Sequence, residues 1–254
     1  PSTLYPFVDG TILTQSLEAA LSTGHFNRVP VISGGNHDEW RLFVADEFDA
    51  VGNPLKDEAN YETAVAALWG AFGSGFVTEI ESVLYPLANY PISPPIPPGD
   101  PSPSPGIALG ASGTDGIFDC PERNGVALLS VFVPTYAYEF NDENAYLVFD
   151  EFPSPPFPPI TFPLGTAHFT EVPYLFDVFS TPSMFTPEQQ QLSESMISYW
   201  TTFAAKGNPN SAGQPLWSRY NPATDEFQSL VPPMPMVETT FNSEHLCSAF
   251  WNTF

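Results

Sequence analysis

The apolar residues of this 254-residue chain recur in patterns that predict a few strands among several helices. The segments 28–33 and 133–140 are rich in β-branched and aromatic residues, and both are expected to be strands. The first of them reads as buried and is expected to end at Gly34-Gly35. Helical spacing predicts helices over 14–23, 38–48, 60–70, 75–88, 107–130 (broken near Cys120-Pro121), 187–205 and 243–254.

Turn and proline signals predict the connections between these elements. Asp9-Gly10 suggests a tight hairpin over 5–13, and 227–231 and 236–240 are expected to be short edge strands. The proline-rich stretches 91–106 and 153–163 are expected to be surface loops, because proline lacks a backbone donor and fixes φ. Neither stretch is flanked by a motif set of its own, so we expect residues 1–254 to belong to a single domain.

The charge of the chain restricts its partners. A net charge of −23 with only six Lys and Arg leaves no basic surface, which argues against binding to nucleic acid or to anionic membranes and favours a neutral or cationic substrate. No stretch of 18 apolar residues occurs, so no integral membrane segment is expected. The pI near 4.1 is common among extracellular proteins. Because the chain opens at Pro1 without Met, we expect the true N-terminus to lie upstream.

Two motifs far apart in the chain carry candidate chemistry. Gly34-Gly35-Asn36-His37-Asp38-Glu39 places carboxylates just after a strand, and Gly165-Thr166-Ala167-His168 places a histidine in a loop. This order matches the last two members of the Ser…Asp/Glu…His series of an α/β-hydrolase. The residues alone leave two alternatives open: Asp38 and Glu39 compete for the acid, or both lie in the first turn of a helix.

His168 is the candidate general base, since a loop lets an imidazole serve both nucleophile and leaving group. A structural histidine is the alternative. Glu171 is a candidate partner that supports the base, whereas His-x-x-Glu alone is a weak metal signal, so no metal or cofactor is predicted. His37 is expected to be a solvated loop residue, and His25 and His245 receive no role.

A nucleophile is not evident. The elbow Gly-x-Ser-x-Gly does not occur, and neither Ser112 nor Ser211 has the flanking glycines that this turn requires. The acid and base are therefore expected to act on a serine outside these residues. Cys120 and Cys247, the only cysteines, are either buried and reduced or paired. A bridge over so long a loop would stabilise the fold by roughly 4–5 kcal/mol.

Five segments in the same order resemble the type B carboxylesterase family of α/β-hydrolases, which includes lipases and cholinesterases. They are Val29 through Glu39 with Phe43, Tyr136 through Phe140, Gly165 through Tyr174, Tyr199 through Ala204 with Gly207 through Asn210 and Trp217, and Cys120-Pro121 with Cys247 and Phe250-Trp251. Trp40 stands where the family usually has glycine, and the insert 91–106 is unusual; both are expected to alter the substrate gorge or its lid.

The resemblance implies the C-terminal portion of an α/β fold, a mostly parallel sheet flanked by helices, without the N-terminal strands and nucleophile elbow. It implies that Glu39 is the triad acid, His168 the base, Glu171 an accompanying buried acid, and Cys120–Cys247 a disulfide. The implied function is hydrolysis of a small-molecule or lipid ester by a secreted serine esterase or lipase, together with the N-terminal half of the same polypeptide.

Two other classes remain open. A non-catalytic adhesion or binding member of the same fold would carry a glycine in place of the nucleophile. An unrelated secreted interaction module with proline-rich loops would be favoured by free thiols at Cys120 and Cys247.

Overall fold

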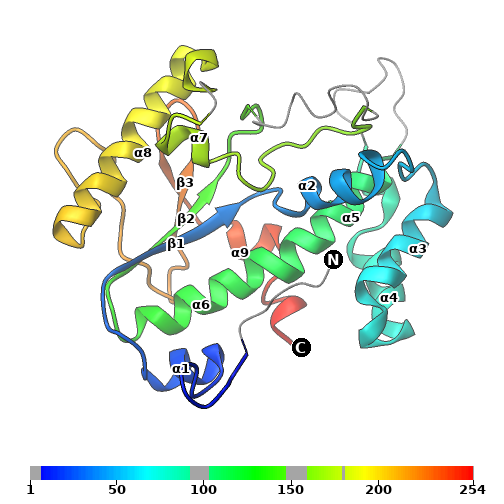
Figure 1. Cartoon of the computed structure of the whole chain (residues 1–254), viewed down its shortest axis with the longest axis horizontal. Coiled ribbons are helices and arrows are strands. Elements are labelled where there is room, and N and C mark those ends of the chain that lie inside the picture. The colour runs from blue at the N-terminus through cyan, green and yellow to red at the C-terminus, as the bar shows by residue number, and fades with distance from the viewer. Residues whose placement is uncertain (1–6, 92–102, 147–158, 179–180, 254) are drawn as a thin grey trace.

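A four-stranded sheet lies at the centre of the protein, in a computed structural model that describes residues 7–91, 103–146, 159–178 and 181–253 (Figure 1). The strand order is β1 (Val31–Asn36), β2 (Thr135–Phe140), β3 (Phe227–Leu230) and β4 (Met236–Glu238). The first three strands run parallel, and β4 runs antiparallel to β3. This mixed, open sheet with flanking helices confirms the expected α/β class.

The helices cover the sheet and extend beyond the end of β1, where α2 to α5 gather (Figure 1). The α-helices are α1 (Leu17–Thr23), α2 (Trp40–Val44), α3 (Glu58–Trp69), α4 (Ser74–Glu79), α5 (Pro105–Gly113), α6 (Cys120–Ser130), α7 (Val172–Leu175), α8 (Pro187–Lys206) and α9 (Phe241–Glu244). π-Helical turns extend three of them, over Ala45–Asp49, Ile80–Leu84 and Thr114–Asp119.

Alternation along β2 divides the core between the two faces of the sheet, because successive strand residues point to opposite sides. Phe140 packs in one cluster with Leu192 and Met196 of α8. Ala137, three positions earlier, packs in another cluster with Val126 of α6. The sheet is therefore covered by α8 on one side and by α6 on the other.

The best predicted element is α8, because its ends carry strong local signals. Thr186 accepts from the backbone of Gln189, whose side chain caps Thr186 in return, and Pro187 starts the helix. Gly207 ends it in the left-handed conformation. Ser16 and Gly24 bound α1 in the same way, which shortens the predicted helix to Leu17–Thr23.

Glycine marks an error in the predicted end of the first strand. Gly34 and Gly35 do not close β1 but continue it to Asn36. A Cβ on Gly34 would lie 2.1 Å from the carbonyl oxygen of Tyr138 on β2. The residue is therefore glycine because the neighbouring strand approaches closely, and not because the chain turns.

The ends of the chain also differ from prediction. The hairpin fails over the described residues 7–13, because the exposed Asp9 carboxylate accepts from the backbone of Thr11, Ile12 and Leu13 and makes a local turn. At the other end, the expected helix 243–254 is replaced by α9, further turns and a short 3-10 helix at Trp251–Thr253.

The middle of the chain holds the remaining corrections. The predicted loop 91–106 ends early, since α5 begins at Pro105, and residues 92–102 and 153–158 of the predicted loops lie outside the described residues. The helical path stays intact at Cys120-Pro121, because proline is tolerated in the first turn of α6. The π-turn Thr114–Asp119 is the irregular part. β3 is internal and fully buried rather than an edge strand.

A disulfide joins the start of α6 to the segment after α9. Cys120 and Cys247 lie 127 residues apart in sequence, and both are fully buried. The bridge thereby connects one sheet-covering helix to the C-terminal region.

Candidate active site

Glu39 and His168 meet beyond the carboxyl end of β1. Glu39 follows the last residue of the strand by three positions, and His168 lies in the loop before α7. The Nδ1 atom of His168 is 2.5 Å from Oε2 of Glu39. The Glu39 side chain is 7% exposed and the His168 side chain 45% exposed. The pair thus combines a shielded carboxylate with an imidazole that another group can reach.

Asn36 fixes the carboxylate and the histidine loop together. Its backbone N–H donates to Oε1 of Glu39 at 2.8 Å. Its side-chain amide donates to Oε2 of Glu171 at 2.6 Å and to the carbonyl of Ala167 at 2.9 Å. Both oxygens of Glu39 are therefore engaged, and the residue before His168 is tied to β1.

Glu171 supports this arrangement by binding Asn36 and not by a hydrogen bond from His168. Burial raises the pKa of the Glu171 carboxyl, while the hydrogen bond from Asn36 acts in the opposite direction. Sequence reasoning selected Glu171 but missed Asn36. The available signal was an amide at the end of a strand three residues before the candidate acid.

The structure separates the two carboxylates that the sequence left in competition. Asp38 is 2.8 Å from the guanidinium of Arg41 and accepts from the backbone N–H of Thr166 at 3.1 Å. Only Glu39 reaches the His168 ring. Asp38 therefore holds the histidine loop from its other end, and neither carboxylate lies inside α2, which begins at Trp40.

Gly165 makes the Asp38 contact possible. Its φ is +58°, and a Cβ there would lie 2.1 Å from Oδ2 of Asp38. We expect Gly165→Ala to lower the free energy of unfolding by about 1–3 kcal/mol, because it adds backbone strain and displaces the carboxylate. Gly213→Ala is the matched control, since Gly213 has φ +89° with open space around it. Equal losses in urea unfolding would show that crowding at Asp38 is unimportant.

Aromatic rings form a wall beside the histidine. The centroid of the His168 ring is 5.2 Å from that of Phe43 and 5.6 Å from that of Phe118. Phe169, the next residue, has φ +80°, which is uncommon for a non-glycine residue. Backbone conformations of this kind occur most often at active sites and ligand-binding loops. An apolar substrate group would find a matching surface at this position.

Electrostatics favour the charged form of His168. The hydrogen bond that the His168 imidazole donates to Glu39 raises the pKa of His168, and partial burial opposes this without cancelling it. A carboxylate placed in this way keeps the proton on Nδ1, which leaves Nε2 to exchange protons with a substrate or nucleophile. The pair can therefore act as a base that an acid orients.

Two of the other histidines, His37 and His245, differ from expectation. His37 is not simply solvated, because its Nδ1 is 2.8 Å from the buried carboxylate of Glu139. His245 is 2% exposed and paired with acidic residues. His25 is exposed and contacts the hydroxyl of Thr23. Sequence reasoning missed the contacts of His37 and His245 because their acidic partners lie more than a hundred residues away in the sequence.

Neither serine considered in the sequence takes the nucleophile position. Ser112 is buried in α5, where its hydroxyl donates to the carbonyl of Leu109 at 3.0 Å. Ser211 shares a hydrogen bond with Ser198 of α8 at 3.0 Å. Both hydroxyls are committed to structural contacts.

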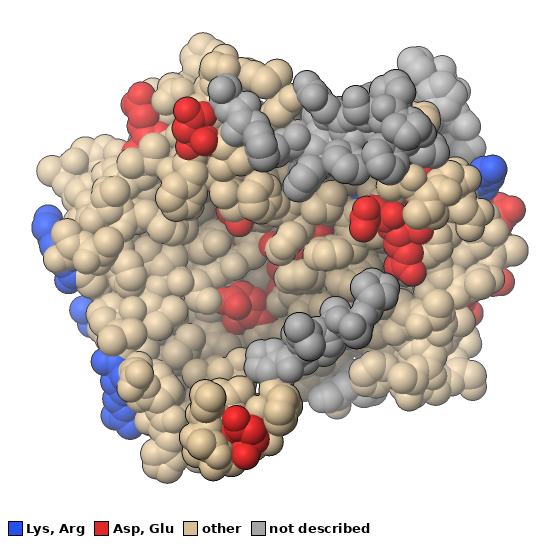
Figure 2. Space-filling view, in the orientation of Figure 1, with Lys and Arg blue, Asp and Glu red and all other residues tan. Residues whose placement is uncertain are grey.

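The surface is poor in basic groups. In Figure 2, the lysines and arginines of the face in view lie at its margins. Among helices in the described part of the chain, none has both the length and the apolar character that crossing a membrane requires.

The fold is that of an α/β-hydrolase, and the comparisons with known proteins agree. The model of the carboxylesterase family matches residues 2–249, so the chain belongs to this family. Liver carboxylesterase 1 of Mus musculus is 28% identical over 91% of the chain and 39% of its own length. Bile salt-activated lipase of Mus musculus is 26% identical over 46% of the chain and 18% of its own length.

A solved structure supports the fold. The protein described as a thermophilic pNB esterase superposes with a TM-score of 0.61 at 22% identity, covering 91% of this chain and 40% of that one. This chain thus spans about two-fifths of that esterase and of the liver carboxylesterase.

Proposed function

We propose that this chain is the C-terminal part of one α/β-hydrolase domain that hydrolyses carboxylic esters. Glu39 supplies the orienting acid and His168 the general base, while the N-terminal part of the same polypeptide supplies the serine and the oxyanion hole. The observation that carries the proposal is the 2.5 Å contact between the two side chains. Membership of the carboxylesterase family supports it.

The proposed mechanism assigns one proton path to His168. Its Nε2 takes the proton of the serine hydroxyl as the serine oxygen attacks the ester carbonyl. It then gives that proton to the departing alcohol, which leaves an acyl-enzyme. Water repeats the sequence and releases the acid. The Glu39 carboxylate stabilises the imidazolium in both half-reactions.

The open edge of β1 supports the placement of the missing nucleophile. Among the described strands, β1 pairs with β2 alone, so its other edge is free. A further parallel strand added there would end beside Glu39, and catalytic groups gather at the carboxyl ends of such strands. A cavity of about 440 Å³ adjoins this edge, lined by Glu39, Gly35 and apolar side chains that include Leu17, Leu21 and Phe118.

The substrate class follows from charge and from the aromatic wall. A strongly acidic protein favours neutral or cationic esters over anionic ones. Phe43 and Phe118 provide an apolar surface next to the base, which suits a small-molecule or lipid ester. The Cys120–Cys247 disulfide supports a secreted protein, because such bonds persist in oxidising compartments.

The direct test compares residues 1–254 with the natural gene product that contains them, using a chromogenic short-chain ester. We expect turnover by the longer protein and none by the chain alone, because the sequence of the chain contains no Gly-x-Ser-x-Gly elbow. A serine-directed organophosphate should label only the longer protein, at a residue upstream of Pro1. Turnover by the chain alone that His168→Ala abolishes would show that the proposed division of the site is wrong.

A pH profile tests the environment of His168. The base must be neutral to accept a proton, and Glu39 raises the imidazole pKa above its ordinary value of 6.5. In the intact protein kcat/KM should therefore rise with pH through a midpoint above 6.5. Glu39→Gln should move this midpoint down, since it removes the negative charge. A midpoint that is unchanged in the variant would contradict the assigned contact.

A further inference from the structure

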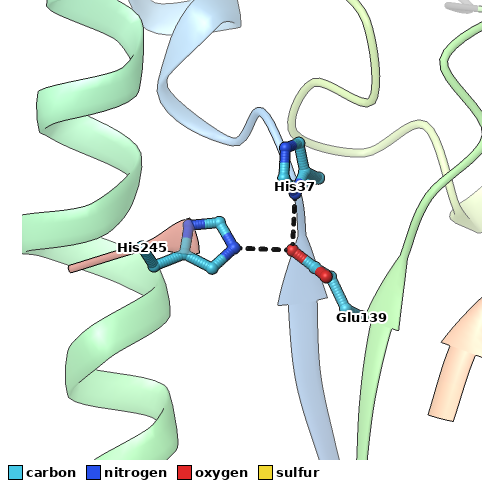
Figure 3. Close-up of side chains that lie close together, drawn as sticks. All are labelled: His37, Glu139 and His245. Carbon is cyan, nitrogen blue, oxygen red and sulfur yellow. Dashed lines mark hydrogen bonds and ion pairs between the residues drawn. The ribbon is translucent and has the colours of Figure 1, made fainter. Parts of the chain in front are cut away.

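A second cluster of ionisable side chains lies apart from the Glu39–His168 pair. His37 follows β1, Glu139 lies on β2 and His245 follows α9, and their side chains converge (Figure 3). The Nδ1 atom of His37 and the Nε2 atom of His245 are 2.8 Å and 2.7 Å from the same oxygen, Oε1 of Glu139. The three potential ligand atoms all lie within 4.8 Å of one another.

We propose that His37, Glu139 and His245 bind a first-row divalent cation, for which zinc is the best match. Two imidazole nitrogens and one carboxylate oxygen form a donor set that zinc uses with water as a fourth ligand. Zinc–ligand distances of about 2.0–2.2 Å place neighbouring donors roughly 3.3 Å apart. Each nitrogen would move about 0.5 Å away from the Glu139 oxygen to admit the ion. The His37 side chain, 38% exposed, has room for this movement.

Partners outside the three ligands already orient them. Oδ1 of Asp115 is 2.6 Å from Nδ1 of His245, which directs Nε2 of the same ring toward Glu139. The side-chain amide of Asn141 donates to the other Glu139 oxygen, Oε2, at 3.0 Å. A carboxylate on the remote nitrogen of a ligating histidine is a common feature of zinc sites, because it fixes the tautomer and strengthens the ligand.

The buried charge around the cluster favours an additional cation. Asp115, Asp119 and Glu139 are all at most 5% exposed. Asp119 lies 3.2 Å from Nδ1 of His245, yet within the described residues neither of its oxygens has a hydrogen bond. A carboxylate left in this state is costly to bury. A dication bound at Nε2, on the opposite side of the His245 ring, would offset part of this negative charge.

The cluster is accessible from solvent. His37 and His245 line a cavity of about 710 Å³, whose wall also carries Glu143 and Glu244. These carboxylates attract cations toward the cavity, which has room for the water that would complete the coordination. Zinc bound there would join the segments after β1 and after α9. It would stabilise the loop that carries Glu39, two residues beyond His37.

Metal uptake is best measured with cobalt, because Co²⁺ occupies zinc sites and absorbs visible light there. The natural gene product is stripped with a chelator, titrated with Co²⁺, and then exchanged with Zn²⁺, with elemental analysis at each stage. His37→Ala is the test variant, since the partly exposed ring can be removed without opening the core. His25→Ala is the matched control, because His25 is exposed and outside the cluster.

The expected result is one Co²⁺ per chain with visible absorption, displaced by one Zn²⁺. His25→Ala should bind Co²⁺ with the affinity of the wild type. His37→Ala should bind Co²⁺ at least about tenfold more weakly, because loss of even a residue that only supports a metal ligand lowers metal affinity by that factor. Zinc should raise the thermal midpoint of the wild type and of His25→Ala but not of His37→Ala. If Co²⁺ is not taken up at one ion per chain, or if His25→Ala and His37→Ala bind it with equal affinity, then His37, Glu139 and His245 form an ion-pair network without a metal. Circular dichroism of each variant confirms folding, and the outcome is independent of esterase activity.

Discussion

Replacement of His168 by alanine in the intact protein is expected to lower kcat/KM for ester hydrolysis by about 10⁴-fold or more. The loss is large because, under the proposed mechanism, the serine hydroxyl then has no base to accept its proton. The side chain is 45% exposed, so its removal should leave the fold intact. Initial rates on a chromogenic ester give the ratio, and unfolding in urea gives the stability of each variant.

Two further variants make this result specific. His25→Ala removes an exposed histidine outside the site and should retain wild-type activity. Glu39→Gln keeps the shape of the carboxyl group. Its kcat/KM should lie between those of His25→Ala and His168→Ala, because the imidazole loses its orienting charge but remains in place. Activity in His168→Ala within a few fold of the wild type would remove His168 from the mechanism.

Loss of the disulfide should cause the largest change in stability. Cys120→Ala combined with Cys247→Ala is expected to lower the free energy of unfolding by about 2–5 kcal/mol. The bridge spans 127 residues of sequence, so without it the unfolded chain gains a large number of conformations. Both cysteines are fully buried, which adds a packing loss to this effect.

Urea unfolding of the wild type, oxidised and reduced, separates these two contributions. Reduction removes the bond while it keeps both sulfur atoms, whereas the double variant also removes their volume. Ser248→Ala, next to Cys247, is a control that should unfold like the oxidised wild type. A double variant with the same midpoint and slope as the oxidised wild type would show that the bridge contributes nothing to stability.

Local signals account for the parts of the fold that the sequence predicted well. The ends of α8 were predictable because Thr186, Pro187 and Gly207 each act on the backbone within a few residues of their own position. The strand β2 was predictable because aromatic and β-branched residues fill it. The boundary of β1 was misplaced because the role of Gly34 depends on Tyr138, a residue on a different strand.

In the candidate site, too, local patterns in the sequence predicted features that depend on neighbouring residues but not contacts between residues far apart in the chain. Sequence alone could not choose between Asp38 and Glu39, since both follow the same strand. The choice depended on family resemblance, and it agrees with the direction of the two side chains, because Arg41 and Thr166 bind Asp38. The His245 network was invisible in the sequence, because its partners Asp115 and Glu139 are distant along the chain.

The hydrogen bonds of Asn36 have a consequence for assembly. They join the loop after β1 to the loop before α7 using groups of this chain alone. Under the proposed division of the site, the orientation of the imidazole is set before any serine arrives. If this chain and the proposed N-terminal part were expressed separately and associated at the free edge of β1, they would then regain ester hydrolysis. The rate of ester turnover would measure how much of the complex has formed.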